Sequence, residues 1–271
     1  MTDSSSITLQ EAMDQLVQAD VAGDAGRTRH VDHCMEVLAE YLLQCSDLFQ
    51  DAEMQEETPI LDWEQGLDTH MEELFEGDIA AVPDLGNVPL AKLDPEHIRD
   101  FLAWFMLREV AADSDIIGTY AATLRAWFGF MHEKGWWDDT TRMSFLSVLA
   151  EVEPDAVRAA KAARVLFHFV RHGGGVPPRL RGQRFSRFVE GHARIAAIDA
   201  AHVWFRFDSQ DVEIGPIALP KIILELLQAG DVLDIELGLR GDVWMIVDIG
   251  PLYPGCIYME AEEFEFTEKA S

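Results

Sequence analysis

The residues best suited to binding chemistry are basic and lie in one stretch, Arg158–Arg194. This stretch contains nine Arg and Lys residues and one acid, Glu190. Eight basic and 33 acidic residues precede it, and four basic and 15 acidic residues follow it. Arginines that alternate with Phe185 and Phe188 could contact phosphates while the rings stack on bases. The same arginines could instead form an internal electrostatic bridge between the two acidic parts of the chain. The predicted binding residues of this stretch are Arg171, Arg179, Arg181, Arg184 and Arg187.

Two further groups of side chains have types and spacings that allow binding. His30 and His33 are three residues apart on one face of a predicted helix, beside Cys34, and imidazole and thiolate groups are zinc ligands. No second pair with matching spacing occurs, so these are weak metal candidates, and the sequence predicts neither a metal nor another cofactor. Trp136 and Trp137 follow the end of a predicted helix, where they either pack under that end or form an aromatic patch for a partner.

No stretch of the sequence carries a specific catalytic motif. Gly173–Gly175 could hold a phosphate at a helix N-terminus, but it follows a helical pattern and runs into Val-Pro-Pro, which is typical of a helix end. With 49 Asp and Glu residues in the chain, carboxylate pairs at useful separations arise by chance and do not indicate acid–base catalysis. The sequence therefore favours a protein without enzymatic activity.

The charge of the whole chain is strongly negative. Its formal net charge is −28 at pH 7, and sixteen acids occur between His30 and Ala91 without any Lys or Arg. Such a charge repels nucleic acids and anionic membranes at long range. The acidic region is then a solvated face, a docking surface for a basic protein, or an imitation of a polyanion.

Length and composition limit the class of protein. A chain of 271 residues with 48% hydrophobic residues can form one large domain or two smaller ones with a substantial core. No apolar run approaches the roughly 18–20 residues that span a bilayer, and the polar start, 1–6, lacks the features of a secretory signal. Cys34, Cys45 and Cys256 form no CxxC motif, which fits a reduced cytoplasmic setting.

Helical periodicity dominates the first 172 residues. Thr8–Glu11 is a capping box, and Asp94-Pro95-Glu96 combines an N-cap, a proline at the first helical position and an early acid. The clearest apolar stripe runs from Ile117 to Met131, before a glycine at position 135 that ends the helix. The predicted helices are 8–19, 28–48, 60–74, 94–105, 117–134, 141–150 and 154–170, with a linker or sub-boundary at 80–92.

After Arg184 the pattern changes to the alternation that is typical of strands. Leu219-Pro220 opens a short helix that Gly230 closes, and an acidic tail begins at Glu260. The predicted strands are Ala193–Ile198, His202–Phe207, Leu233–Leu237, Val243–Ile249 and Tyr253–Met259. The sequence thus predicts an α+β protein with an all-helical N-terminal domain (1–172), a linker (173–184) and a small β-barrel-like domain (185–271).

The segment Leu93–Trp137 resembles the SAM-like core-binding domain of tyrosine recombinases. The resemblance rests on the acidic N-cap at Asp94, the helix Ile117-Gly-Thr-Tyr-Ala-Ala-Thr-Leu-Arg-Ala-Trp-Phe128 and the Lys134-Gly135 end. It implies a helical scaffold of the kind that contacts DNA. The family's catalytic domain has no counterpart, because His168-Phe-Val-Arg171 lies inside the last predicted helix and a short β-rich region follows it. Recombinase catalysis is therefore not carried over.

The segment 217–237 resembles the swapped-hairpin barrels of AbrB-type regulators. In both, a strand is followed by a proline-led helix, here from Pro220, then by a Gly-Asp pair, here Gly230-Asp231, and by a second strand. The resemblance implies a barrel and, because a fold alone does not define an activity, no particular function.

Three functions are compatible with these features. The favoured one is a non-enzymatic, cytoplasmic interaction or regulatory protein whose acidic surface meets a basic partner. One alternative is a nucleic-acid-associated protein that uses the Arg158–Arg194 stretch. The other is an enzyme whose site lies at a domain junction, where pockets often form. No membrane contact is expected.

Overall fold

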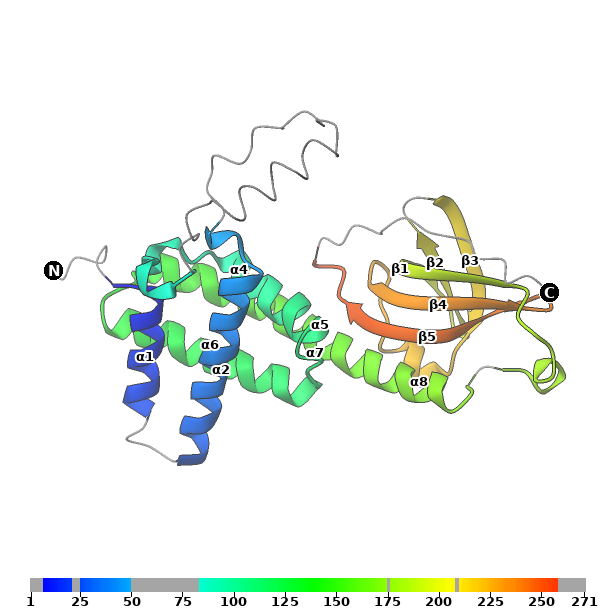
Figure 1. Cartoon of the computed structure of the whole chain (residues 1–271), viewed down its shortest axis with the longest axis horizontal. Coiled ribbons are helices and arrows are strands. Elements are labelled where there is room, and N and C mark those ends of the chain that lie inside the picture. Colours follow the sequence, from blue (N-terminus) through cyan, green and yellow to red (C-terminus); the bar gives the residue numbers. More distant parts are fainter. Residues whose placement is uncertain (1–6, 21–24, 50–82, 175, 208–209, 258–271) are drawn as a thin grey trace, which may run out of the picture. The chain divides into compact units, whose positions relative to one another are not determined.

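The computed structural model describes residues 7–20, 25–49, 83–174, 176–207 and 210–257 (Figure 1). The predicted helix 60–74 and the acidic tail from Glu260 lie outside the described residues. The chain divides into two compact units. The first comprises Met1–Asp94 with Phe130–Trp137, and the second comprises Pro95–Gly129 with Asp138–Ser271. The linker predicted at 173–184 lies within the second unit, and its role as a domain boundary stays a prediction.

The first unit is helical in its described part. The capping box forms as predicted, because the Glu11 backbone N–H donates to the Thr8 hydroxyl at 3.2 Å and the Thr8 N–H donates to the Glu11 carboxylate at 3.0 Å. Both contacts satisfy N–H groups that have no partner inside the helix. The elements are α1 (Leu9–Asp20), α2 (Ala25–Gln44) and the short helices η1 (Asp47–Phe49), η3 (Leu85–Asn87) and η4 (Leu90–Lys92).

The second unit begins with the predicted proline-led helix. Its helices are α4 (Pro95–Asp100), the π-helical turn η5 (Phe101–Phe105), α5 (Met106–Arg108), α6 (Ser114–Glu133, in this unit to Gly129) and α7 (Asp139–Arg171). The predicted stripe of α6 is buried within this unit at Ile117, Tyr120, Leu124, Trp127 and Phe128. The helical period therefore identified the buried face of α6 correctly.

The C-terminal helix of this region is longer than its sequence indicates. The separate helices predicted at 141–150 and 154–170 form one helix, α7, with Pro154 inside it. Proline removes one backbone hydrogen bond, and the turns on either side of it continue. Asp138 caps the start by accepting from the Thr141 N–H at 2.7 Å. The helix ends at Arg171, where Gly173 adopts a positive φ of 69°.

Five antiparallel strands form one sheet in the second unit, in the order β3-β2-β1-β4-β5 (Figure 1). The short helix α8 (Lys221–Leu224) follows Pro220 as predicted. Aliphatic and aromatic side chains on alternating positions make the sheet's core, including Val189, Ile195, Phe205, Ile235 and Leu237. The strands are β1 (Arg187–Ile198), β2 (His202–Phe207), β3 (Gln210–Ala218), β4 (Val232–Arg240) and β5 (Val243–Tyr253).

The predicted closure of these strands into a barrel is wrong. The strands β3 and β5 are the two edges, and no hydrogen-bonded ladder joins them among the described residues. Parts of these two strands approach within 8 Å between Cα atoms, so the sheet is curved but open. Closure depends on strand tilt and on the stagger of the register, neither of which is visible in an alternating pattern of apolar residues.

Helix α7 packs against the edge strand β5, which places helices and sheet in one compact unit (Figure 1). Cys34, Cys45 and Cys256 are free thiols. Within the described ranges, no helix has the length and apolar character that a bilayer span requires.

Candidate functional site

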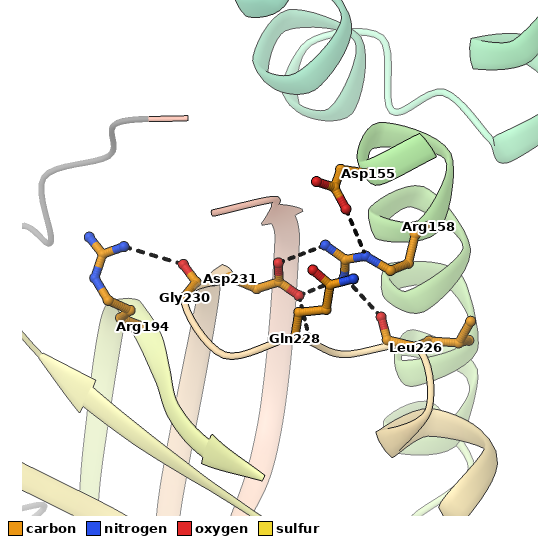
Figure 2. Close-up of polar contacts among 7 residues, drawn as sticks. All are labelled: Asp155, Arg158, Arg194, Leu226, Gln228, Gly230 and Asp231. Atoms are coloured by element: carbon orange, nitrogen blue, oxygen red, sulfur yellow. Dashed lines mark hydrogen bonds and ion pairs between the residues drawn. The ribbon is translucent and has the colours of Figure 1, made fainter. Parts of the chain in front are cut away.

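The first residue of the basic stretch, Arg158, is committed to a structural contact (Figure 2). Its guanidinium donates two hydrogen bonds to the Asp231 carboxylate, at 2.7 and 2.8 Å, and one to the Leu226 carbonyl at 2.9 Å. Its Nε also donates to Asp155 at 3.3 Å. Burial opposes the charge of Arg158, but the hydrogen bonds and charge of Asp231 outweigh it and raise the pKa of the guanidinium. Arg158 therefore ties α7 to the turn before β4.

Arg158 is not one of the arginines for which the internal bridge was predicted, so this contact leaves that prediction untested. One partner, Asp155, precedes the basic stretch, and the other, Asp231, follows it. Asp231 is 1% exposed and also accepts from the Gln228 backbone N–H at 2.8 Å, so its carboxylate is well satisfied. Further along the stretch, the Arg194 guanidinium donates to the Gly230 carbonyl at 3.2 Å, beside Asp231 (Figure 2).

The five predicted binding arginines lie on or after the end of α7. Arg171 stacks over Phe167, with 5.0 Å from the guanidinium to the ring centre. Arg179 makes a long contact of 3.8 Å with Asp242, and both side chains are exposed. Four of the five arginines lie in one short segment, 179–187. All four are exposed, including Arg181, Arg184 and Arg187.

Aromatic rings accompany this segment, as the sequence predicted. The rings of Phe185 and Phe188 lie 5.2 Å apart, and the Arg240 guanidinium from β4 lies 4.0 Å over the Phe185 ring. Guanidinium groups and rings are thus adjacent at the start of β1. Whether this segment recognises a partner stays a prediction.

The two predicted tryptophans differ in their surroundings. Trp137 is 6% exposed, and its carbonyl oxygen lies 3.2 Å from the His132 Nδ1. Trp136 is partly exposed and meets the Phe130 ring edge-on at 5.8 Å. These contacts support the interpretation in which the pair packs under the end of α6.

The weak metal candidates do not converge with other ligands in the described part of the chain. His30 and His33 are exposed on α2, whereas Cys34 is fully buried in the core. The His33 ring nitrogen lies 3.7 Å from Glu36, which is a helical neighbour three positions away. Among the described residues, no group of three or more His, Cys, Asp and Glu side chains is arranged to hold a metal ion.

The structure brings together an acidic row that sequence reasoning did not identify. Glu190 of β1 is directly opposite Glu236 of β4, and Glu236 is directly opposite Asp248 of β5. Directly opposite residues of antiparallel strands project from the same face, with Cβ atoms about 4.5–5.5 Å apart. These three residues, which we call the acidic row, therefore place three carboxylates side by side across three strands.

The acidic row lies in a concavity of about 420 Å³ that Asp234 also lines. Two glycines shape its floor. Gly191 has a φ of 139°, which favours glycine, and a Cβ at Gly250 would lie 2.5 Å from the Asp234 carboxylate. Glu190 and Asp248 are exposed, while Asp234 and Glu236 are partly buried. The site can therefore hold a cationic group against four carboxylates.

One signal for the acidic row was present in the sequence. Asp234 and Glu236 alternate with Leu233, Ile235 and Leu237, which correctly indicated that both acids share the polar face of a strand. The alignment of Glu236 with residues 190 and 248 depends on the register of three strands, which a single strand pattern does not contain.

Comparison of the chain with protein-family models finds no match, and comparisons with curated proteins and with solved structures find none either.

Proposed function

We propose that this chain is a non-enzymatic, cytoplasmic interaction protein that binds a basic partner through the acidic row. The observation that supports the proposal best is the direct opposition of Glu190, Glu236 and Asp248 across three strands. Like charges that face each other in a ladder destabilise a sheet. A cationic side chain placed among the three carboxylates would reduce the repulsion between them.

The charge of the whole chain supports the same function. A net charge of −28 attracts basic partners over long distances and repels acidic ones. Long-range attraction of this kind raises association rates more than it raises final affinity. The local geometry of the acidic row would then define where a partner's lysines and arginines bind.

The test compares two variants with the same change in net charge. In the first, Glu190→Gln, Glu236→Gln and Asp248→Asn are combined; in the control, Asp32→Asn, Glu40→Gln and Glu133→Gln remove three exposed carboxylates elsewhere. Calorimetry would measure the binding of a short synthetic peptide rich in Lys and Arg at about 0.15 M salt. We expect the first variant to bind about tenfold more weakly or worse, and the control to bind nearly as the wild type does.

A second measurement on the same proteins distinguishes a binding site from a general surface. Loss of like-charge repulsion should raise the free energy of unfolding of the first variant by about 0.5–2 kcal/mol, although its binding falls. Equal weakening of peptide binding in the two variants would show that only net charge matters, and the acidic row would not be the site.

One observation supports the alternative of nucleic-acid binding. Arg181 and Arg184 are exposed beside the Phe185 and Phe188 rings. The net charge argues against strong contacts with phosphates. We expect dissociation constants for duplex DNA no tighter than about 10–100 µM at physiological salt. Nanomolar, sequence-selective binding that is lost when Arg179, Arg181 and Arg184 are all replaced by Glu would favour this alternative over the acidic row.

A further inference from the structure

A groove of about 680 Å³ lies in the second unit, and it shares Ile249 and Gly250 with the concavity of the acidic row. This volume is within the range of about 300–1,000 Å³ that is usual for small-molecule sites. Ile116 and Phe167 are each 41% exposed, so large apolar side chains on the groove's wall face solvent. The apolar part of the lining comes from α5, α6, α7 and β5 and includes Leu107, Ile116, Ala163, Phe167, Ile249 and Leu252.

The backbone between α5 and α6 is bent to form one side of this groove. Ala111 adopts a positive φ of 48°, which is unusual for a residue with a Cβ. The turn closes with a hydrogen bond from the Ala112 N–H to the Met106 carbonyl at 2.9 Å. It places Ala112 and Asp113 along the groove. Backbone strain of this kind is common where a local shape is needed at a binding site.

Two arginines line the otherwise apolar groove. Arg164 of α7 lies 3.6 Å from Asp113, and both side chains are well exposed, so this pair is weak and its guanidinium is accessible. Arg108 of α5 contacts Glu109 at 3.2 Å and stacks over Trp104. Each of the two arginines thus has a carboxylate neighbour, and the longer contact leaves the Arg164 guanidinium better placed to bind a second anionic group.

We propose that the groove binds a small amphiphile with a single apolar chain and a carboxylate head. The apolar walls of α7 and β5 would cover the chain, and Arg164 would donate charge-assisted hydrogen bonds to the carboxylate. The anionic head is required because a neutral ligand would make no charge-assisted hydrogen bond with Arg164. This site borders the concavity of the acidic row, and it would act alongside the binding of a basic partner.

The experiment uses the full chain and two probes of equal chain length, decanoate and decanol, below the concentration at which either aggregates. Isothermal calorimetry should show saturable binding of one decanoate per chain. The variant Arg164→Gln should weaken decanoate binding by about tenfold while decanol binding is unchanged, since only the charge-assisted contact is lost. The matched control Lys161→Gln, an exposed cation of the same helix outside the groove, should leave both unchanged.

Two variants fill or polarise the groove and test its location. Ala163→Trp should abolish binding of both probes, and Ile116→Asp, at an exposed position, should do the same without adding volume. The proposal is overturned if the wild type shows no saturable decanoate binding, or if Lys161→Gln weakens it as much as Arg164→Gln does. It is also overturned if both groove variants bind decanoate as well as the wild type.

Discussion

At the scale of single residues, Arg158 and Asp231 make the polar contact with the largest expected effect on stability. Their side chains are 14% and 1% exposed, so solvent screens this ion pair little. Breaking a buried pair by removing one charge leaves the other charge without compensation, which typically costs about 3–5 kcal/mol. We therefore expect Asp231→Asn to lower the free energy of unfolding by that amount, measured by urea denaturation.

The control for this prediction is the second carboxylate on the same guanidinium. Asp155 is 34% exposed and lies 3.3 Å from Arg158, so Asp155→Asn should cost less than about 1 kcal/mol. Similar small losses for both variants would contradict the structural role assigned to Asp231.

The side chain of Tyr253 should make the stability of the folded protein depend on pH. Burial raises the pKa of Tyr253 to about 12; Arg108 opposes the shift, and Asp234 and Glu109 add to it. In the unfolded chain the phenol of Tyr253 ionises at about pH 10. Between these values the folded state holds a proton that the unfolded state has lost, so stability falls as the pH rises.

The expected loss from Tyr253 between pH 10 and 12 is about 2 kcal/mol. Because lysines and other tyrosines titrate in the same range, the measurement is the difference between the wild type and Tyr253→Phe. The free energy of unfolding should decline less steeply in the variant. Parallel decline of the two proteins over this range would show that Tyr253 does not carry a raised pKa.

At the scale of elements, Pro154 is expected to destabilise α7, because it lies inside the helix. Pro154 is exposed and lies near the middle of a 33-residue helix, where proline is about 3 kcal/mol less favourable than alanine. The rigidity that proline gives the unfolded chain offsets up to about 1 kcal/mol of this. Pro154→Ala should therefore raise the free energy of unfolding by about 1–2 kcal/mol, measured by denaturation with urea.

A suitable comparison is Ser147→Ala, at another exposed position of α7, which should change stability by less than about 0.5 kcal/mol. No gain from Pro154→Ala would indicate that the proline is needed for the path of the helix.

Elements with a strong local signal were predictable, and contacts between elements were not. The start at Pro95, the buried stripe of α6 and the strand β2 follow from caps and periodicity, which are properties of the local sequence. The acidic row and the open sheet depend on strand tilt and on register, which here aligns residues as far apart in the chain as Glu190 and Glu236. The role of Asp231 also escaped prediction, because its Gly-Asp turn had a sufficient explanation in backbone conformation alone.

At the scale of the whole molecule, opposite charges occupy different parts of the second unit. Four exposed arginines lie in 179–187, and the carboxylates of the acidic row lie on β1, β4 and β5. This separation allows the chain to present a basic segment and an acidic concavity at once. Since screening acts within about 8 Å at physiological ionic strength, binding to either should weaken as salt increases.

The organisation of the chain around the segment 173–184 can be tested by limited proteolysis. Arg179 and Arg181 are exposed beside the short helix η6 (Pro178–Leu180), so mild trypsin should cut there first. The two fragments should nevertheless remain together in gel filtration. Helix α7 packs on β5 across the cut, and the Arg158–Asp231 pair joins the same two parts.

The variant with both Arg179→Gln and Arg181→Gln should resist this first cleavage. That result would show that trypsin cuts first after Arg179 or Arg181. Separation of the fragments under native conditions would instead support an independent C-terminal domain that begins near residue 185, as the sequence predicts. In that case, adding Asp231→Asn should not change the elution of the cleaved protein. If the fragments are held by the contacts of α7, the same substitution should promote their separation, because it removes a buried ionic contact between them.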